Sequence, residues 1–513
     1  MKFTKLAKFS LFLLTLAVVI IGLLRFTNLS ADPVNISILH NEDEGNYSYN
    51  ARNLTLNNKL IVDGVNFFFV SPLWTILQYP FVKVVGVTFS AFRLPAALSS
   101  IILIIAIIFF VKKVTNKVIF GLIAGLLTAS NFLLLIHSRI AMPETTVVLL
   151  STLGLMAWYQ TLKKYPQINL KWSLTTGIFW SLGYLAKGNG IYLGITMFLA
   201  VFLIMLIKRQ LPSIKELPKL FCPFLIFAVV YFTTTIIFKT TFPFESSVAS
   251  LELTDKYRPL LRSQVLNPAF WLASLSGTLQ GGEATVWRLL PFLAIGSLLF
   301  MVGTIVKIVR RQADVLDASI LAFLVGSLFW FNLITYKPAR YFLLVVPALI
   351  VSNVLLIRNQ GLVKYLGLIL IIATLFLDCV LGIKYVYTHQ TFEDVQVASK
   401  LGMVLNSELS TGKSEGVWML DNPYPVENIY FLGQTDVTSQ EKAVAIINYF
   451  NRYRWPSYIV TKTTSLPDWI NKLTTKKSVL KTRLNLVINH HLETLLIFNF
   501  SNGSPAKGAL IQT

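Results

Sequence analysis

Three consecutive carboxylates lie shortly after the first apolar segment, within the sequence HNEDEGNYSYNAR at residues 40–52. The spacing of the residues that follow predicts that this acidic turn opens a helix, whose N-terminus would keep a carboxylate ionised. An ionised carboxylate at a membrane surface can act as a general base toward a hydroxyl. A solvated acidic loop and a divalent-cation site formed by Glu42, Asp43 and Glu44 are the alternative interpretations.

Further charged residues lie where short loops meet apolar segments. They are Arg93, Arg139, Glu144, Lys187, Lys337 and Arg340. The topology argued below places them all on the outer side, where an excess of cations runs against the positive-inside rule and requires a reason. The phosphate of a lipid is such a reason, because Arg can bind it with two donors and Lys binds it as a point charge. A snorkelling Arg139, and a Glu144 that merely starts a helix after Pro143, are the simpler alternatives.

Long apolar runs must position these residues. Hydrophobic residues make up 54% of the 513 residues and charged residues only 13%, which excludes a single soluble domain and a disordered chain. A membrane span needs about 20 apolar residues. The first run is interpreted as a retained signal anchor, because many spans follow it. The runs predict eleven spans, near residues 9–24, 95–111, 118–136, 145–162, 172–186, 190–207, 220–238, 289–306, 318–335, 341–357 and 365–383.

The loops between these spans assign the two sides of the membrane. The lysines before the first span place the N-terminus in the cytoplasm. Five basic loops then fall on the cytoplasmic side, at 112–117, 163–171, 208–219, 307–312 and 358–364. Residues 67–92 are broken by Pro72 and Pro80, and counting them as a span would move the basic loops outside. We therefore predict a juxtamembrane helix there, lying at the outer interface.

The net charge of +21 follows from these basic loops. No basic stripe interleaved with aromatic residues stands out, so we expect no nucleic-acid partner. Both cysteines, Cys222 and Cys379, fall inside apolar segments, which excludes a disulfide framework and a cysteine-based metal site. The expected environment of residues 1–384 is therefore the lipid bilayer, in a multi-pass protein of the plasma or inner membrane.

The last part of the chain has a different composition. Residues 385–513 are polar and mixed in charge, with strand-like runs at 416–420, 457–460 and 494–498 and a helical stretch at 439–452. This pattern predicts a small α/β domain. The span count places it outside the cytoplasm. It carries no nucleotide-binding loop or catalytic signature.

Five segments in order, DEGNYSYNARNL, FRLPAALSS, RIAMPE, LGYLAKGNG and YKPARYFLLVVPAL, together resemble a known family. The family is the polyprenyl-phosphate-sugar-dependent integral-membrane glycosyltransferases of GT-C fold, with protein O-mannosyltransferases and aminoarabinose-transferase-like enzymes among its members. The resemblance covers roughly residues 9–384. It implies an α-helical polytopic fold and an active site on the extracytoplasmic face.

The resemblance also implies roles for individual residues. Asp43-Glu44 matches an Asp-Glu pair in the first outer loop, whose Asp is taken as the catalytic base or the residue that orients the acceptor. Glu144 matches an acidic position in the second outer loop that is often Asp, so the side chain here is longer. The positions that match cations near the lipid phosphate are Arg93, Arg139, Lys187, Lys337 and Arg340.

The implied reaction joins a polyprenyl-phosphate-linked sugar donor to a glycan, lipid or protein acceptor. Asp43 would remove or orient the acceptor proton while the nucleophile attacks the anomeric carbon, and direct displacement would invert that centre. Polyprenyl phosphate leaves as an anion, so cations can stabilise it without a strong general acid. No cofactor is required by this chemistry, although Glu42, Asp43 and Glu44 leave a divalent metal open.

Other classes of protein share some of these features. A transporter or flippase of lipid-linked sugars would place ionisable residues deep within its spans, whereas here they crowd at the outer ends, with Asp378 nearest to an exception. A polysaccharide polymerase or ligase shares the substrate class and is the closer alternative.

Overall fold

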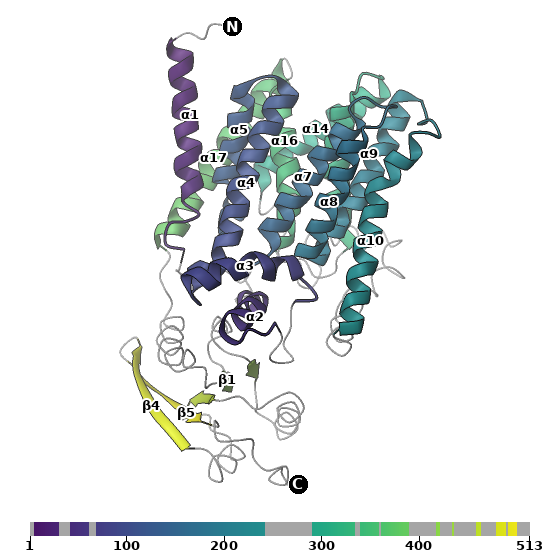
Figure 1. Cartoon of the computed structure of the whole chain (residues 1–513). Helices are drawn as coiled ribbons and strands as arrows, with labels where there is room; N and C mark the ends of the chain where they lie inside the picture. The colour runs from purple at the N-terminus through teal and green to yellow at the C-terminus, as the bar shows by residue number, and fades with distance from the viewer. Residues whose placement is uncertain are drawn as a thin grey trace.

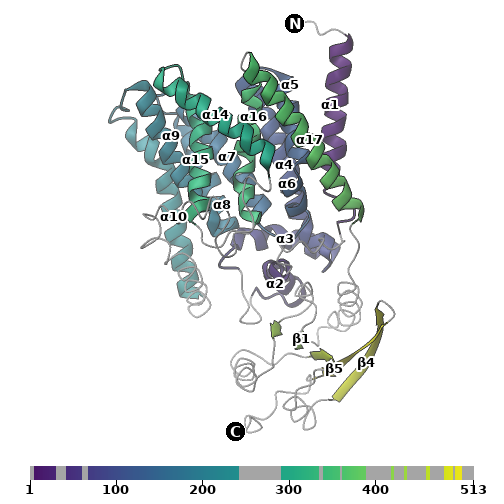
Figure 2. The ribbon, with the colours of Figure 1, turned by 180° about the vertical axis from the view of Figure 1, so that it is seen from behind.

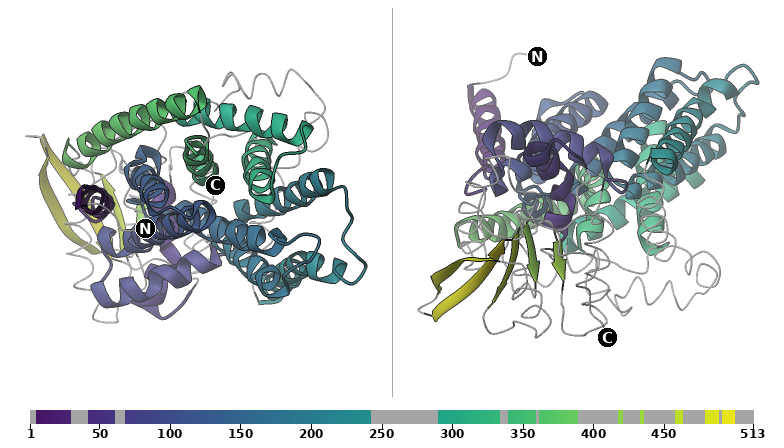
Figure 3. Two further views of the ribbon diagram at one scale, coloured as in Figure 1. Left: turned by 90° about the horizontal axis from the view of Figure 1, so that it is seen from above. Right: turned by 60° about the horizontal axis from the view of Figure 1, so that its bottom comes forward.

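The computed structural model describes residues 5–29, 42–60, 68–241, 290–333, 339–358 and 361–388, together with five strands in the C-terminal part. The described chain is mostly helical. Long helices run side by side in one bundle (Figures 1 and 2). Seen from above, α1 stands end-on at the edge of this bundle (Figure 3).

A helix lies at each predicted span. The elements are α1 (Lys5–Leu23), α4 (Phe89–Thr115), α5 (Val118–Ser130) with α6 (Phe132–His137), α7 (Glu144–Leu162), α8 (Leu170–Ala186), α9 (Tyr192–Lys208) after the 3-10 turn η1 (Gly188–Ile191), α10 (Leu217–Thr241), α14 (Pro291–Val309), α15 (Val315–Leu333), the 3-10 turn η2 (Ala339–Leu344) with α16 (Val346–Leu356), and α17 (Leu362–Thr388).

Five helices in the described ranges are long and apolar enough to cross a membrane: α4, α9 with its preceding turn, α10, α14 and α17. Their outer faces carry large apolar side chains, such as Phe198 at 70% exposure and Phe376 at 73%. Exposed apolar surface on this scale suits contact with lipid. The total of eleven spans stays a prediction.

The core of the bundle lies around α7 and α16. Residues 147–150 of α7 and 346–351 of α16 are buried, and they belong to one hydrophobic cluster with side chains of α4 and α15. Side-chain hydrogen bonds add specificity within this core. Asn353 of α16 donates to the Leu293 carbonyl and to Ser297 Oγ of α14, at 2.9 and 3.1 Å.

Two shorter helices close one end of the bundle. α2 (Glu42–Asn57) and α3 (Pro72–Val85) lie at the end opposite the N-terminus, with α3 running across the helix ends (Figures 1 and 2). Pro72 occupies the first turn of α3, where its missing N–H costs nothing. A helix therefore lies within the predicted segment 67–92, whose last residues belong to α4, and the place of α3 at the outer membrane interface stays a prediction.

The described part of the tail is one sheet with strand order β2-β1-β3-β5-β4. Its strands are β1 (Val417–Leu420), β2 (Gly433–Thr435), β3 (Tyr458–Lys462), β4 (Val479–Ile488) and β5 (His491–Asn499). β1 pairs in parallel with β2 and β3, and β5 pairs antiparallel with β3 and β4. Strands therefore lie at the three predicted runs. The predicted helical stretch at 439–452 lies outside the described residues, so the α/β character of the tail stays a prediction.

Candidate active site

The acidic turn opens α2, as the sequence predicts. Glu42 and Asp43 are the first two residues of the helix, and the description of the structure does not extend to their side chains. Glu44 follows and is 2% exposed. α2 lies at the end of the bundle, beside α3 (Figure 1).

Glu44 forms a buried ion pair with Arg93 of α4. The guanidinium donates from Nε to Glu44 Oε1 at 2.6 Å and from Nη2 to Oε2 at 2.8 Å. The amide N–H of Ala141 also donates to Oε1, at 2.6 Å, and Arg93 Nη1 donates to the Leu29 carbonyl at 3.0 Å. A buried charge pair is stable only when such bonds satisfy both partners. This pair joins α2 to α4, and its further hydrogen bonds connect the two helices to the backbone at Leu29 and Ala141.

Arg139 is also buried, and its guanidinium donates hydrogen bonds to carbonyl groups. Its guanidinium donates to the carbonyls of Leu24 at 2.7 Å and Asn28 at 3.0 Å, and to that of Thr27. These carbonyls follow the end of α1, where helical partners are missing. These hydrogen bonds hold the residues that follow α1 against Arg139. Its predicted part in binding the lipid phosphate has no support from these contacts.

Arg25 was not among the predicted site residues, and like Arg139 it donates hydrogen bonds to backbone carbonyls. It is fully buried and donates to Ser100 Oγ at 2.5 Å and to the carbonyls of Ala129 and Thr128 at 2.9 and 3.1 Å. The sequence offered a signal that we did not use: a cation that ends the first span on the predicted outer side.

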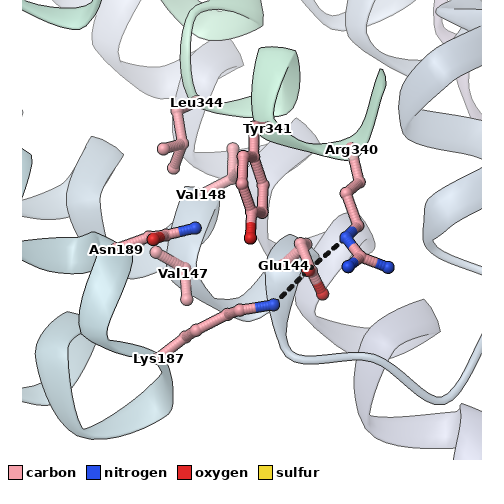
Figure 4. Close-up of a pocket in the computed structure, with 8 residues that line it drawn as sticks. All are labelled: Glu144, Val147, Val148, Lys187, Asn189, Arg340, Tyr341 and Leu344. Atoms are coloured by element: carbon pink, nitrogen blue, oxygen red, sulfur yellow. Dashed lines mark hydrogen bonds and ion pairs between the residues drawn. The ribbon is translucent and has the colours of Figure 1, made fainter. Parts of the chain in front are cut away.

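A pocket forms where Glu144, Lys187 and Arg340 converge (Figure 4). Glu144 is the first residue of α7, Lys187 lies between α8 and η1, and Arg340 lies in η2. Lys187 Nζ lies 2.5 Å from Glu144 Oε1, and Arg340 Nε lies 3.5 Å from the same oxygen. All three residues are buried. The structure thus brings together three predicted site residues that are far apart in sequence.

Aromatic and apolar side chains surround these charges. The Lys187 ammonium lies 4.8 Å from the ring centroid of Tyr47 and 5.6 Å from that of Tyr341. Such cation–π contacts stabilise a buried ammonium. The remaining residues that line the pocket are Val147, Val148, Asn189 and Leu344. One end of the pocket is therefore charged and another is apolar.

The two cations keep Glu144 ionised. Burial opposes ionisation, but Lys187 and then Arg340 outweigh it, so the pKa of Glu144 lies below its usual value. Burial likewise opposes the charge on Lys187, and Glu144 outweighs it with help from Tyr47 and Tyr341, which raises the pKa of Lys187. Among the described residues of this pocket, two positive charges therefore face one negative charge. Glu144 Oε2 is buried and has no hydrogen-bond partner among the described residues.

His137, at the end of α6, lies near the same charges. Burial lowers its pKa to about 4, against the attraction of Glu144 and with the repulsion of Arg340 and Lys187. Its carbonyl accepts a hydrogen bond from Thr145 Oγ1 at 3.1 Å, while its Nδ1 has no partner in the described ranges. The imidazole is neutral at physiological pH. His137 stands in the second outer loop, two residues before Arg139, and we did not predict a role for it.

Other predictions fall outside what can be placed. Lys337 lies outside the described residues. Within the described ranges, no group of three or more His, Cys, Asp or Glu residues could hold a metal ion. The predicted alternative of a metal on Glu42, Asp43 and Glu44 depends on two side chains that are not described, and it stays a prediction. Tyr47 and Tyr341, which flank Lys187, were not predicted as site residues.

A family of known proteins matches part of this chain in sequence. Residues 70–238, which run from α3 to α10, match the family model of the dolichyl-phosphate-mannose-protein mannosyltransferases. This segment includes Arg93, Glu144 and Lys187. No curated protein matches the chain in sequence.

Solved structures match over nearly the whole chain. ArnT from Cupriavidus metallidurans in the apo state covers 98% of this chain and 100% of its own, with a TM-score of 0.58 and 11% identity. ArnT from the same organism bound to undecaprenyl phosphate covers 97% and 100%, with a TM-score of 0.56 and 12% identity. The archaeal oligosaccharyltransferase AglB from Archaeoglobus fulgidus, in complex with an inhibitory peptide and a dolichol-phosphate, covers 88% and 70%, with a TM-score of 0.51 and 11% identity.

These matches confirm the predicted resemblance. At 11–12% identity the structural matches show a shared fold, the GT-C fold of membrane glycosyltransferases. The family model belongs to the same enzyme class. The class predicted from the sequence, a glycosyltransferase that resembles users of lipid-phosphate-linked sugars, is therefore confirmed.

Proposed function

We propose that this glycosyltransferase-fold chain transfers a sugar from a polyprenyl-phosphate-linked donor to an acceptor on the extracytoplasmic face of the membrane. The observation that carries the proposal is the pocket of Glu144, Lys187 and Arg340. Two structural neighbours, ArnT and AglB, were solved with undecaprenyl phosphate and dolichol-phosphate, which supports a lipid phosphate as the ligand.

The charge of the pocket favours an anion. Among the described residues that line the pocket, one carboxylate faces two cations, an excess of one positive charge in a buried setting where an unmatched charge is costly. A phosphate at Lys187 and Arg340 removes this excess. The apolar lining from Val147, Val148 and Leu344 then suits the first part of an isoprenoid chain. A lipid phosphate matches both halves of the pocket.

The acceptor side of the site is assigned to the first turn of α2. Asp43 precedes Glu44, whose bonds to Arg93 and Ala141 fix the helix start. In this proposal Asp43 removes or orients the proton of an acceptor hydroxyl or amine, and the nucleophile attacks the anomeric carbon. The bond from that carbon to the phosphate oxygen breaks, and polyprenyl phosphate leaves with its charge stabilised by Lys187 and Arg340. Direct displacement inverts the anomeric centre.

We also propose different roles for two of the predicted residues. Glu44 and Arg93 satisfy each other at 2.6 and 2.8 Å, so we assign them to positioning α2 rather than to chemistry or phosphate binding. Glu144 keeps a part in the active site, because its second oxygen is unpartnered in the described chain and its first holds Lys187.

The membrane arrangement belongs to the same proposal. Residues 1–384 form the membrane part with eleven spans, a cytoplasmic N-terminus and the pocket on the outer side. Residues 385–513 form an extracytoplasmic α/β domain. In Figure 1 the described strands lie at the same end as α2 and α3, which agrees with this arrangement.

Transfer by membranes that contain the protein tests the proposal. Wild type is supplied with undecaprenyl-phosphate sugars carrying a radiolabel, and we expect release of undecaprenyl phosphate with transfer of label. Lys187→Met should weaken binding of the donor, while Asp43→Asn should slow transfer with little change in donor binding. Lys219→Met is the matched control, because its pair with Glu216 at 2.8 Å is partly exposed and lies outside the site.

Two results would overturn the proposal. One is a folded wild type that neither binds undecaprenyl phosphate nor turns over any donor in the panel. The other is a Lys187→Met variant that binds and transfers like the Lys219→Met control. Full activity in Asp43→Asn alone would keep the phosphate pocket and move the base to another carboxylate.

A further inference from the structure

One face of α3 presents three polar atoms that nothing in the described chain satisfies. Ser71, Trp74 and Gln78 are at most 1% exposed. Ser71 Oγ, Trp74 Nε1 and Gln78 Oε1 have no hydrogen-bond partner within the described residues. The three positions are spaced three and four apart, so they share one side of the helix. Buried polar groups are nearly always paired, and three unpaired ones on a single face require an explanation.

Ser71 is the clearest case. It stands at the N-cap of α3, where a serine normally accepts a bond from an N–H of the first turn. Here its side chain makes no capping bond. Its hydroxyl is therefore available to another group, although the residue type is the one that capping favours.

The hydrogen bonds of Gln78 fix the orientation of its side-chain amide. Its Nε2 donates to Ser48 Oγ of α2 at 3.3 Å and to the Phe92 carbonyl at 3.2 Å. The carbonyl accepts only, so the amide cannot be turned to place Oε1 there. Oε1 is left over as an acceptor. The unpaired set thus holds one donor in Trp74, one acceptor in Gln78, and one group in Ser71 that can do both.

The face lies next to the phosphate pocket. Trp74 and Tyr47 belong to one buried cluster, together with Ala96, Ile140 and Met142. The Tyr47 ring in turn lies 4.8 Å from Lys187 Nζ. The Tyr47 ring therefore belongs to the same cluster as Trp74 of α3 and also contacts the Lys187 ammonium, which we assign to the donor phosphate.

We propose that Ser71, Trp74 and Gln78 form a subsite for the hydroxyl groups of the donor sugar. This inference rests on the proposed function, because the sugar is bonded directly to the phosphate that Lys187 would hold. A neutral sugar fits the set, since hydroxyl groups both donate and accept.

An unpaired group alone would not support a sugar site. Trp180 Nε1 also lacks a partner in the described chain, but its ring is stacked on Phe227 at 4.0 Å between centroids, among apolar side chains. The α3 face differs because donor and acceptor groups occur together beside a charged pocket.

Binding of two probes tests the subsite. The probes are undecaprenyl phosphate and undecaprenyl-phosphate mannose, measured by displacement or by thermal shift on the full chain. Ser71→Ala removes only an unpaired hydroxyl, so it should fold with a Tm equal to or above that of wild type. Trp74→Phe removes the unpaired Nε1 together with part of a buried ring, so its Tm should fall, as that of the Trp158→Phe control below should. Each should bind the mannose-bearing lipid about five- to tenfold more weakly, as expected for one lost hydrogen bond. Binding of undecaprenyl phosphate should not change.

Trp158→Phe is the matched control, because Trp158 Nε1 donates to the Met197 carbonyl at 3.2 Å. It should lower the Tm and leave the ratio of the two affinities unchanged. An unchanged ratio in Ser71→Ala and Trp74→Phe would overturn the subsite, and slower transfer with that unchanged ratio would place the acceptor there instead. A wild type that binds neither probe would refute the proposed function itself, which distinguishes the two failures.

Discussion

Replacing Glu144 by Gln should have opposite effects on stability and on ligand binding. The substitution leaves Lys187 and Arg340 buried without their carboxylate, and breaking a buried ion pair in this way costs about 3–5 kcal/mol. The Tm of the protein without lipid should therefore fall. The same carboxylate, however, lies 2.5 Å from the ammonium that we assign to the donor phosphate. It should therefore repel that phosphate.

The size of this repulsion follows from the geometry. A phosphate that contacts Lys187 from the pocket would lie roughly 5 Å from the carboxylate, and at an effective dielectric constant of about 20 two like unit charges at that separation repel by about 3 kcal/mol. Glu144→Gln should accordingly bind undecaprenyl phosphate up to about 100-fold more tightly. Turnover should fall, because release of the product becomes slower and the carboxylate is lost from the site.

Thermal unfolding in detergent, with and without undecaprenyl phosphate, measures both effects. A ligand at free concentration L that binds the native state stabilises it by RT ln(1 + L/Kd), so at one ligand concentration a tighter ligand gives a larger rise in Tm. Glu144→Gln should start from a lower Tm and show a larger ligand-induced shift than wild type. Glu216→Gln, which removes the carboxylate of the partly exposed pair with Lys219, is the control. A smaller shift in Glu144→Gln than in wild type would refute the assignment of the phosphate to this pocket.

Three further predictions concern stability. Arg93→Met should lower the stability by about 3–5 kcal/mol, because it leaves Glu44 buried without its partner; a Tm equal to that of wild type would contradict the role of this pair. The contribution of His137 to wild-type stability should be fully present above pH 6.5 and should be lost toward pH 4, by up to about 3 kcal/mol. Burial lowers the pKa of His137 from 6.5 to about 4, so between these values the unfolded chain binds more protons than the folded chain. His137→Asn should flatten this slope, and an unchanged slope would exclude His137 as its origin. Gly296→Ala should lower the Tm, since an added Cβ would lie 1.9 Å from Asn353 Oδ1; a wild-type Tm would show that α14 and α16 can separate.

The helices could be predicted from the sequence more easily than their ends. Apolar runs mark the part of a helix that faces lipid, whereas caps decide where the helix begins and ends. The predicted span 95–111 belongs to a helix that begins at Phe89, because the Thr88 side chain accepts a bond from the Ala91 N–H. The predicted span 118–136 is divided at Asn131, whose side chain caps α6 through the Leu134 N–H. Both caps are polar residues that an apolar count does not weigh.

The site could be predicted as a set of residues but not as a set of contacts. Charged residues at the ends of apolar runs must find partners once they are buried, and the sequence shows which residues these are. It does not show the choice among partners, which the packing of distant helices decides. Arg93 pairs with Glu44 across 49 positions, and Lys187 pairs with Glu144 across 43. The sequence predicted that both cations lie near the lipid phosphate. In the structure Arg93 pairs with Glu44, whereas Lys187 lies in the pocket with Glu144.

That division rests on charge matching. Arg93 and Glu44 cancel, and both carboxylate oxygens of Glu44 are occupied. The Glu144 cluster has one more cation than carboxylate and a buried oxygen with no partner among the described residues. Net charge in a buried pocket raises the free energy of a fold unless a partner matches it, and under the proposed function that partner is the lipid phosphate. On this reasoning the two ion pairs differ in kind: the matched pair stabilises the helix that carries Asp43, and the unmatched cluster is the part of the bundle that a lipid phosphate would complete.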